Sequence, residues 1–217
     1  MNNYILVYGE VLDYPQQASI DKSGNAYYKF NLAVTRNSGI VDILPVIVQE
    51  DTKSFEVLAD IDEEGEIIGQ KLLVSGEIRT RNLDVKEHSK VDVSIRAFNI
   101  EVREEYLGKT NQVIINGHIC KGICTRETPR GIKIADVTLA VNREDGSKQS
   151  DYIPSVMWNG TAIRATERLN VGECIEATGR LQSREYIKKL GSGEEEPRTA
   201  FELSVNSYEP LKTKETV

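Results

Sequence analysis

Short stretches in which side chains alternate between two faces dominate the chain, and a period of two is typical of β-strands. In the first stretch, Ile5, Val7 and Gly9 lie on one face and Leu6, Tyr8 and Glu10 on the other. Comparable β-rich runs predict further strands over residues 30–36, 41–48, 76–83 and 94–98. A helical pattern is rarer, and it predicts short helices over Thr52–Ile61 and Thr161–Leu169.

The chain carries this order of segments twice. YILVYGEV near the N-terminus corresponds to VIINGHI, FNLAVTR to VTLAVNR, VDILPVIV to SDYIPSVM, and GEIRTRNL to GRLQSREY. The spacing between the copies varies from one segment to the next, so insertions and deletions fall in loops, as in two separately folded units. We therefore expect two domains, over residues 1–106 and 111–212, joined by the polar linker Arg103–Thr110.

Each copy is predicted to hold five strands with a short helix between the third and the fourth. That order is typical of the oligonucleotide/oligosaccharide-binding (OB) fold. The expected fold class is all-β, with two tandem five-stranded OB-fold barrels.

Charge divides the two copies more sharply than the net charge of −7 suggests. Residues 1–108 hold 11 Lys and Arg against 19 Asp and Glu, a net charge of −8, whereas residues 109–217 hold 16 against 15, a net charge of +1. If the chain binds a polyanion, the charges therefore indicate that the second copy binds it. The alternative is that the acidic copy is merely more soluble.

Several other classes are not expected. No apolar run is long enough to cross a membrane, and the N-terminus lacks the pattern of a signal peptide, so we expect a cytoplasmic protein. The three cysteines predict reduced thiols, and no metal site or cofactor is expected. No catalytic residues are predicted, because a phosphate-binding glycine loop is absent and the acidic run Glu194–Glu196 lies in a solvated loop.

Aromatic and basic residues share faces in the second copy. Alternation puts Tyr152 and Trp158 on one face of a strand, about 20 Å apart at 3.3 Å per residue. The next strand holds Arg180, Arg184 and Tyr186 on one parity, followed by Lys188. Rings spaced between cations suit a stacked polyanion, whereas an apolar core would exclude the charges. The predicted nucleic-acid-binding residues are Tyr152, Trp158, Tyr186, Arg143, Arg180, Arg184, Lys188 and Lys133.

The second copy resembles the bacterial single-stranded DNA-binding protein family, through NQVIINGHI, TPRG, VTLAVNR, SDYIPSVMWNGTA and LNVGECIEATGRLQSREY. The resemblance implies that bases stack on Tyr152, Trp158 and Tyr186. A fourth aromatic position of the family falls near Asp145, which is not aromatic. The first copy resembles the family more faintly, with Ile43, Gln49 and Leu83 in place of the three rings.

The resemblance implies a non-enzymatic protein that binds single-stranded DNA largely independently of sequence, in replication, recombination or repair. The acidic first copy is expected to serve architecture and oligomerisation, and a homodimer would supply four OB folds. Replication or repair proteins are possible partners, but LKTKETV lacks the family's acidic tip. The alternative is a protein-interaction scaffold, of primosomal or mobile-element type, that binds nucleic acid weakly.

Overall fold

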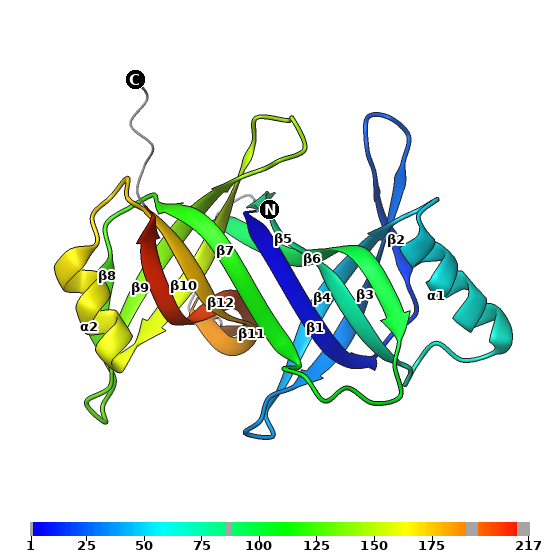
Figure 1. The fold of residues 1–217 in the computed structure, drawn as a ribbon, viewed down its shortest axis with the longest axis horizontal. Helices are drawn as coiled ribbons and strands as arrows, with labels where there is room; N and C mark the ends of the chain where they lie inside the picture. Colours follow the sequence, from blue (N-terminus) through cyan, green and yellow to red (C-terminus); the bar gives the residue numbers. More distant parts are fainter. Residues whose placement is uncertain (1, 86–87, 190–194, 212–217) are drawn as a thin grey trace.

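The computed structural model describes residues 2–85, 88–189 and 195–211, which form two barrels side by side (Figure 1). The first barrel contains β1 (Asn3–Val11), β2 (Gln16–Ile20), β3 (Ala26–Thr35), β4 (Val41–Gln49), α1 (Lys53–Glu64), β5 (Lys71–Val85) and β6 (His88–Val102). The second repeats this order with β7 (Asn111–Ile119), β8 (Cys124–Glu127), β9 (Lys133–Asn142), β10 (Ser150–Trp158), α2 (Asn159–Arg168), β11 (Cys174–Lys189) and β12 (Glu195–Leu211). The predicted tandem OB fold is confirmed.

Each barrel closes through the first strand of its half. In the first barrel β1 pairs with both β3 and β5, and β4 pairs in parallel with β6. In the second barrel β7 pairs with β9 and β11, and β10 pairs in parallel with β12. Apolar side chains that alternate along these strands fill the interior, among them Ile5, Leu32, Val113, Leu139 and Ile153, each 0% exposed. Their burial away from water is the main force that stabilises each barrel.

The two predicted helices are present, with bounds that differ from the sequence expectation. The helix α1 begins after Thr52, whose hydroxyl oxygen accepts from the Phe55 N–H at 3.3 Å, and it ends at Gly65. Such a side-chain cap satisfies a backbone N–H that the helix leaves without a partner. In α2, Ala162 and Ala165 are buried, while Ile163 is 45% exposed. The helices lie at opposite ends of the molecule (Figure 1).

The two barrels are joined by their first strands. β1 and β7 pair antiparallel, with Asn3 opposite Ile115 and Val7 opposite Asn111, so that one twelve-stranded sheet runs through the described residues. The linker is fixed to the first barrel, because the Tyr8 hydroxyl lies 3.0 Å from the carbonyl oxygens of both Arg103 and Glu104. The barrels therefore meet along a defined interface, which we call the seam.

Two ion pairs, related by the approximate two-fold symmetry of the halves, hold this seam. Asp42, 0% exposed, bonds Arg36 of its own barrel at 2.6 Å and accepts the backbone N–H of Ser183 in the other barrel at 2.8 Å. In the same way, Asp151 bonds Arg143 at 2.8 Å and accepts the N–H of Thr80 in the first barrel at 2.7 Å. Each carboxylate is thus buried and fully engaged across the seam.

Candidate nucleic-acid interface

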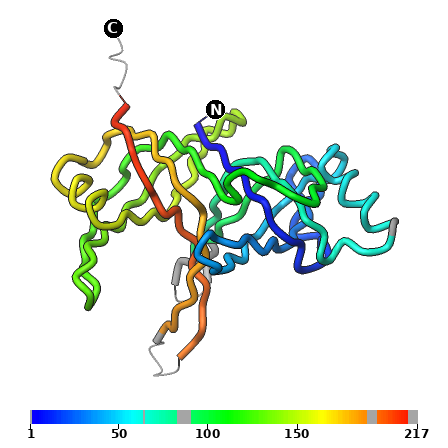
Figure 2. The backbone as a smooth tube through the Cα atoms, turned by 60° about the horizontal axis from the view of Figure 1, so that its bottom comes forward, coloured from blue at the N-terminus to red at the C-terminus, as the bar shows by residue number. Residues whose placement is uncertain are grey.

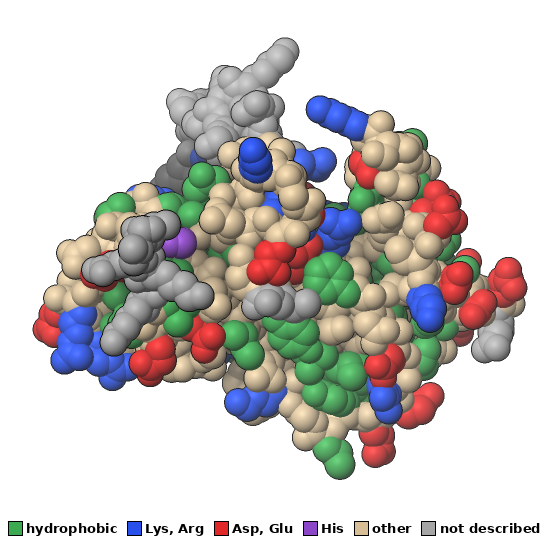
Figure 3. All heavy atoms as spheres, turned by 45° about the horizontal axis from the view of Figure 1, so that its top comes forward, with side chains coloured by type: hydrophobic (Ala, Val, Ile, Leu, Met, Phe, Trp, Pro, Cys, Tyr) green, Lys and Arg blue, Asp and Glu red, His purple; other side chains and the backbone are tan. Residues whose placement is uncertain are grey.

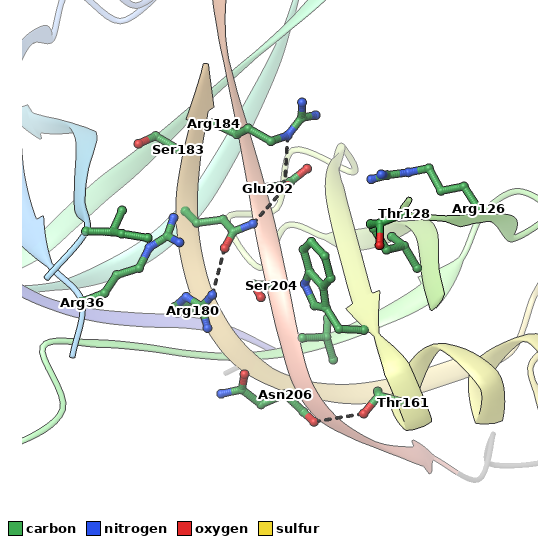
Figure 4. A pocket seen from close by; sticks show the side chains of 15 residues that line it. Arg36, Arg126, Thr128, Thr161, Arg180, Ser183, Arg184, Glu202, Ser204 and Asn206 are labelled. Carbon is green, nitrogen blue, oxygen red and sulfur yellow. Dashed lines mark hydrogen bonds and ion pairs between the residues drawn. The ribbon is translucent and has the colours of Figure 1, made fainter. Parts of the chain in front are cut away.

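A groove with a volume of about 770 Å³ opens on the second barrel next to the seam (Figure 4). Trp158 forms part of its wall, and four arginines line it: Arg36 from the first barrel, and Arg126, Arg180 and Arg184 from the second. We call it the Trp158 groove. Its one described carboxylate, Glu202, accepts from Gln182 at 2.8 Å and lies 3.6 Å from Arg184, which leaves the lining predominantly basic.

The three predicted aromatic residues do not lie together. Trp158 stands where β10 passes into α2 and is half-buried in the groove. Tyr152, 48% exposed, begins the same strand near the seam, where its N–H donates to the Thr80 hydroxyl at 2.9 Å. Tyr186, 37% exposed, belongs to the β11–β12 hairpin, which extends beyond the barrels (Figure 2). Tyr152 and Tyr186 are outside the groove lining, on surfaces of the same barrel.

The predicted cations are also divided. Arg180 and Arg184 line the groove, and the Arg184 guanidinium lies 5.6 Å from the centre of the Tyr186 ring. Such a cation over a ring is a weak attraction that orients both groups. Lys133 forms an ion pair with Glu127 at the start of β9, and Lys188 is half-buried in the projecting hairpin.

Arg143 has a structural contact that the sequence did not indicate. Its guanidinium donates to Asp151 and also to the Thr80 carbonyl of the first barrel, at 3.2 Å. The hydrogen bond to Asp151 raises the pKa of Arg143 above its ordinary value, so the side chain stays charged in place. In this structure Arg143 joins the barrels at the seam, and its predicted contact with nucleic acid stays a prediction.

The first barrel has a smaller groove, about 380 Å³ in volume, at the corresponding place. We call it the Tyr27 groove, after a residue that the sequence comparison missed. Tyr27 lies 5.6 Å below the Arg96 guanidinium, and its hydroxyl contacts Asp21 at 3.3 Å and Gln49 at 3.2 Å. The period-two pairing of Tyr27 with Lys29 along β3 was the available signal. The side chain of Leu83 lies outside the part of the chain that the structure describes.

Acidic side chains gather on the first barrel. On the face in Figure 3 they cluster at the end of the molecule that carries α1, whose sequence KSFEVLADIDEE supplies several of them. Within the described residues no group of three or more His, Cys, Asp or Glu is arranged to hold a metal ion, and the three cysteines are unpaired. No described helix is both long and apolar enough to span a membrane.

Comparison with known proteins finds sequence matches for the second half of the chain. The model of the single-strand binding protein family matches residues 110–211. The match covers slightly less than half of the chain. Single-stranded DNA-binding protein 1 of Streptococcus pyogenes is 36% identical over 85 residues, which are 37% of this chain and 65% of that protein. Single-stranded DNA-binding protein of Bacillus cereus is 38% identical over 80 residues, 35% of this chain and 47% of that protein.

The match therefore spans about half to two thirds of the length of these curated relatives. A solved structure accounts for the whole chain at the level of fold. The wild-type single-stranded DNA binding protein from Thermus aquaticus superimposes with a TM-score of 0.73 over 99% of this chain and 95% of its own, at 22% identity. The tandem arrangement of the two barrels is therefore shared with that protein.

Proposed function

We propose that the chain binds single-stranded DNA without catalysis and largely independently of base sequence. The observation that carries the proposal is the Trp158 groove, in which one large ring stands among four arginines. A base that stacks on such a ring gains about 1–3 kcal/mol, and every base offers a flat face, so stacking tolerates any sequence. The arginines attract phosphates and release counterions, which adds affinity at low salt.

Tyr152 and Tyr186 extend this surface in the proposal, since both rings are exposed on the same barrel. Arg184 and Lys188 would follow the strand along the projecting hairpin. We assign binding to residues 111–212 and an architectural role to residues 1–106, and we place the activity in replication, recombination or repair. The match of residues 110–211 to the single-strand binding protein family model and the names of the relatives support this assignment.

Trp158 makes the proposal directly testable, because it is the only tryptophan of the chain. Oligo(dT) should quench its fluorescence, and oligo(rU) and duplex DNA serve as comparisons. With a labelled oligo(dT) followed by anisotropy, Trp158→Ala should weaken binding by about 1–3 kcal/mol. Trp158→Phe keeps a ring and should retain most of the affinity.

If oligo(dT) leaves the Trp158 emission unchanged, in a protein that circular dichroism shows to be folded, the proposal that bases stack on Trp158 is wrong. If the folded chain also gives no anisotropy change with the labelled oligonucleotide, the protein-interaction scaffold becomes the better explanation.

A further inference from the structure

The Trp158 groove does not end at the second barrel. A second hollow, about 710 Å³ in volume, lies on the other side of the seam, next to the linker residues Leu107–Thr110 and to Asn111 of β7. Both hollows are lined by the same three residues, Arg36, Arg180 and Asn206, so they adjoin there. In Figure 4 the Arg36 side chain reaches from the first barrel toward Arg180 on β11. Two guanidinium groups from different barrels thus meet where the hollows join.

Arg180 forms no ion pair among the described residues. Its Nη2 donates to the neutral Gln182 amide at 3.1 Å, while its Nε is buried with no hydrogen-bond partner among the described residues. No described carboxylate lies within ion-pair distance of it. Burial lowers the pKa of Arg180 and the nearby charge of Arg36 lowers it further, while the charge of Asp42 acts in the opposite direction. A buried cation beside a second cation is costly unless an anion joins them.

The acids nearest to Arg180 are already engaged. Asp42 is held by Arg36 through two bonds of 2.6 Å and by the Ser183 backbone. Glu202 accepts from Gln182 and lies beside Arg184. Neither carboxylate can turn to Arg180 without giving up these contacts. An anion that pairs with Arg180 would therefore come from outside the described residues.

At the symmetry-related end of the seam, positive and negative side chains pair with one another. There Arg143 takes the place of Arg36, and the repeat puts Glu77, not an arginine, at the position of Arg180. Glu77 accepts from Arg79 at 2.6 Å, and Arg79 also lies 3.2 Å from Asp151. The same backbone position therefore carries an acid within a balanced cluster at one end and an unpaired cation at the other. The difference lies in charge, and the fold accommodates both.

We propose that Arg36 and Arg180 together bind one backbone phosphate of a single strand as it leaves the Trp158 groove and crosses the seam. Lys109, which lines the far hollow, lies on the continuation of this path. The inference rests on the proposed function and extends it, since the first barrel then contributes Arg36 directly to the strand. The other end of the seam lacks such a cation, because Glu77 stands at the position of Arg180 and both Arg79 and Arg143 face carboxylates. Arg36 also faces Asp42, so it is Arg180 that distinguishes the two ends.

The test is the salt dependence of oligo(dT) binding by full-length variants. Loss of one phosphate contact lowers the slope of log affinity against log salt by about 0.7 for a single strand, or about five-fold for each ten-fold drop in salt. Arg180→Gln should show this change, and Arg180→Lys should keep the slope of the unmodified chain. Arg180→Glu reverses the charge, so it should lower the slope further, and circular dichroism establishes that this variant is folded. Arg168→Gln, at the exposed end of α2, removes the same charge elsewhere and is the matched control.

A slope that falls for the Gln and Glu variants of Arg180, and stays constant for Arg168→Gln, supports the seam site. Equal slopes for Arg180→Gln and Arg168→Gln, in a parent chain that binds oligo(dT), overturn the seam site alone. A folded parent chain that does not bind oligo(dT) overturns the proposed function, and the seam site with it. The two failures are therefore distinguished by the parent chain.

Discussion

At the scale of single residues, the buried carboxylate of Asp42 should depend on Arg36. Arg36→Ala would leave a charge that is 0% exposed with only the Ser183 N–H and hydroxyl as partners. Removing one partner of a buried ion pair typically costs about 3–5 kcal/mol, since the other charge stays desolvated. We expect a loss of this size in the free energy of unfolding, measured by denaturant titration. Arg103→Ala, which breaks the exposed pair with Glu101, should cost no more than about 1 kcal/mol.

The same residue scale shows where the sequence falls short. Its alternation and resemblance indicated Trp158, Arg180 and Arg184, and the structure gathers these three in one groove. Arg143 looked equally basic in the sequence, yet it bonds Asp151 and Thr80 at the seam. Thr80 is 63 residues away from Arg143 along the chain. No local pattern reveals a partner that distant, because only folding brings it into contact.

At the scale of elements, closure of the second barrel requires a residue without a side chain at Gly179. A Cβ built there would lie 2.1 Å from the carbonyl oxygen of Ser204 in the neighbouring strand β12. That oxygen belongs to the backbone, so the strands must separate to admit a methyl group. Gly179→Ala should therefore lower the free energy of unfolding by about 1–3 kcal/mol or more.

Gly122→Ala is the matched control for this prediction, because nothing lies within 4 Å of the place that its Cβ would occupy and its φ is not positive. We expect its denaturation midpoint to stay within experimental error of the parent chain. Equal effects of the two substitutions would show that strand crowding at Gly179 does not limit stability.

The elements themselves were predictable where one face of a strand is buried. β1 and β7 alternate cleanly between buried and more exposed positions, and the repeat identified both. The short strands β2 and β8 were not predicted as separate strands, because every residue in them is exposed and no apolar alternation marks them. They form only through pairing with β3 and β9, which is a tertiary contact. In α2, tertiary packing likewise buries Ala162 and Ala165 and leaves Ile163 exposed.

At the scale of the whole molecule, we predict a homodimer with four OB folds in total. The first barrel presents exposed apolar side chains, among them Ile20, Ile40, Ile43 and Phe98, and β2 is an outer strand of the sheet. Open strand edges and apolar surface are commonly covered by association. Light scattering at micromolar concentration should give a mass near twice the 24.3 kDa of the chain. A mass of one chain over that range would rule the dimer out.

The difference between the two barrels gives the last prediction. The first barrel carries a net charge of −8 and has Ile43 and Gln49 where the second has Tyr152 and Trp158. Its own ring, Tyr27, is half-buried and bonded to Asp21 and Gln49. Stacking and phosphate attraction are therefore both weaker on that side. In the full chain, Trp158→Ala should reduce affinity for oligo(dT) by about 1–3 kcal/mol, and Tyr27→Ala by much less.

Both variants remove one aromatic ring next to an arginine, so each serves as the control for the other. Thermal unfolding by circular dichroism should first establish that each variant is folded at the temperature of the titration. The affinity for labelled oligo(dT) is then compared at the same salt, because unequal screening would imitate a difference in stacking. Equal losses from the two substitutions would mean that both barrels stack bases, and the architectural role assigned to residues 1–106 would then be wrong.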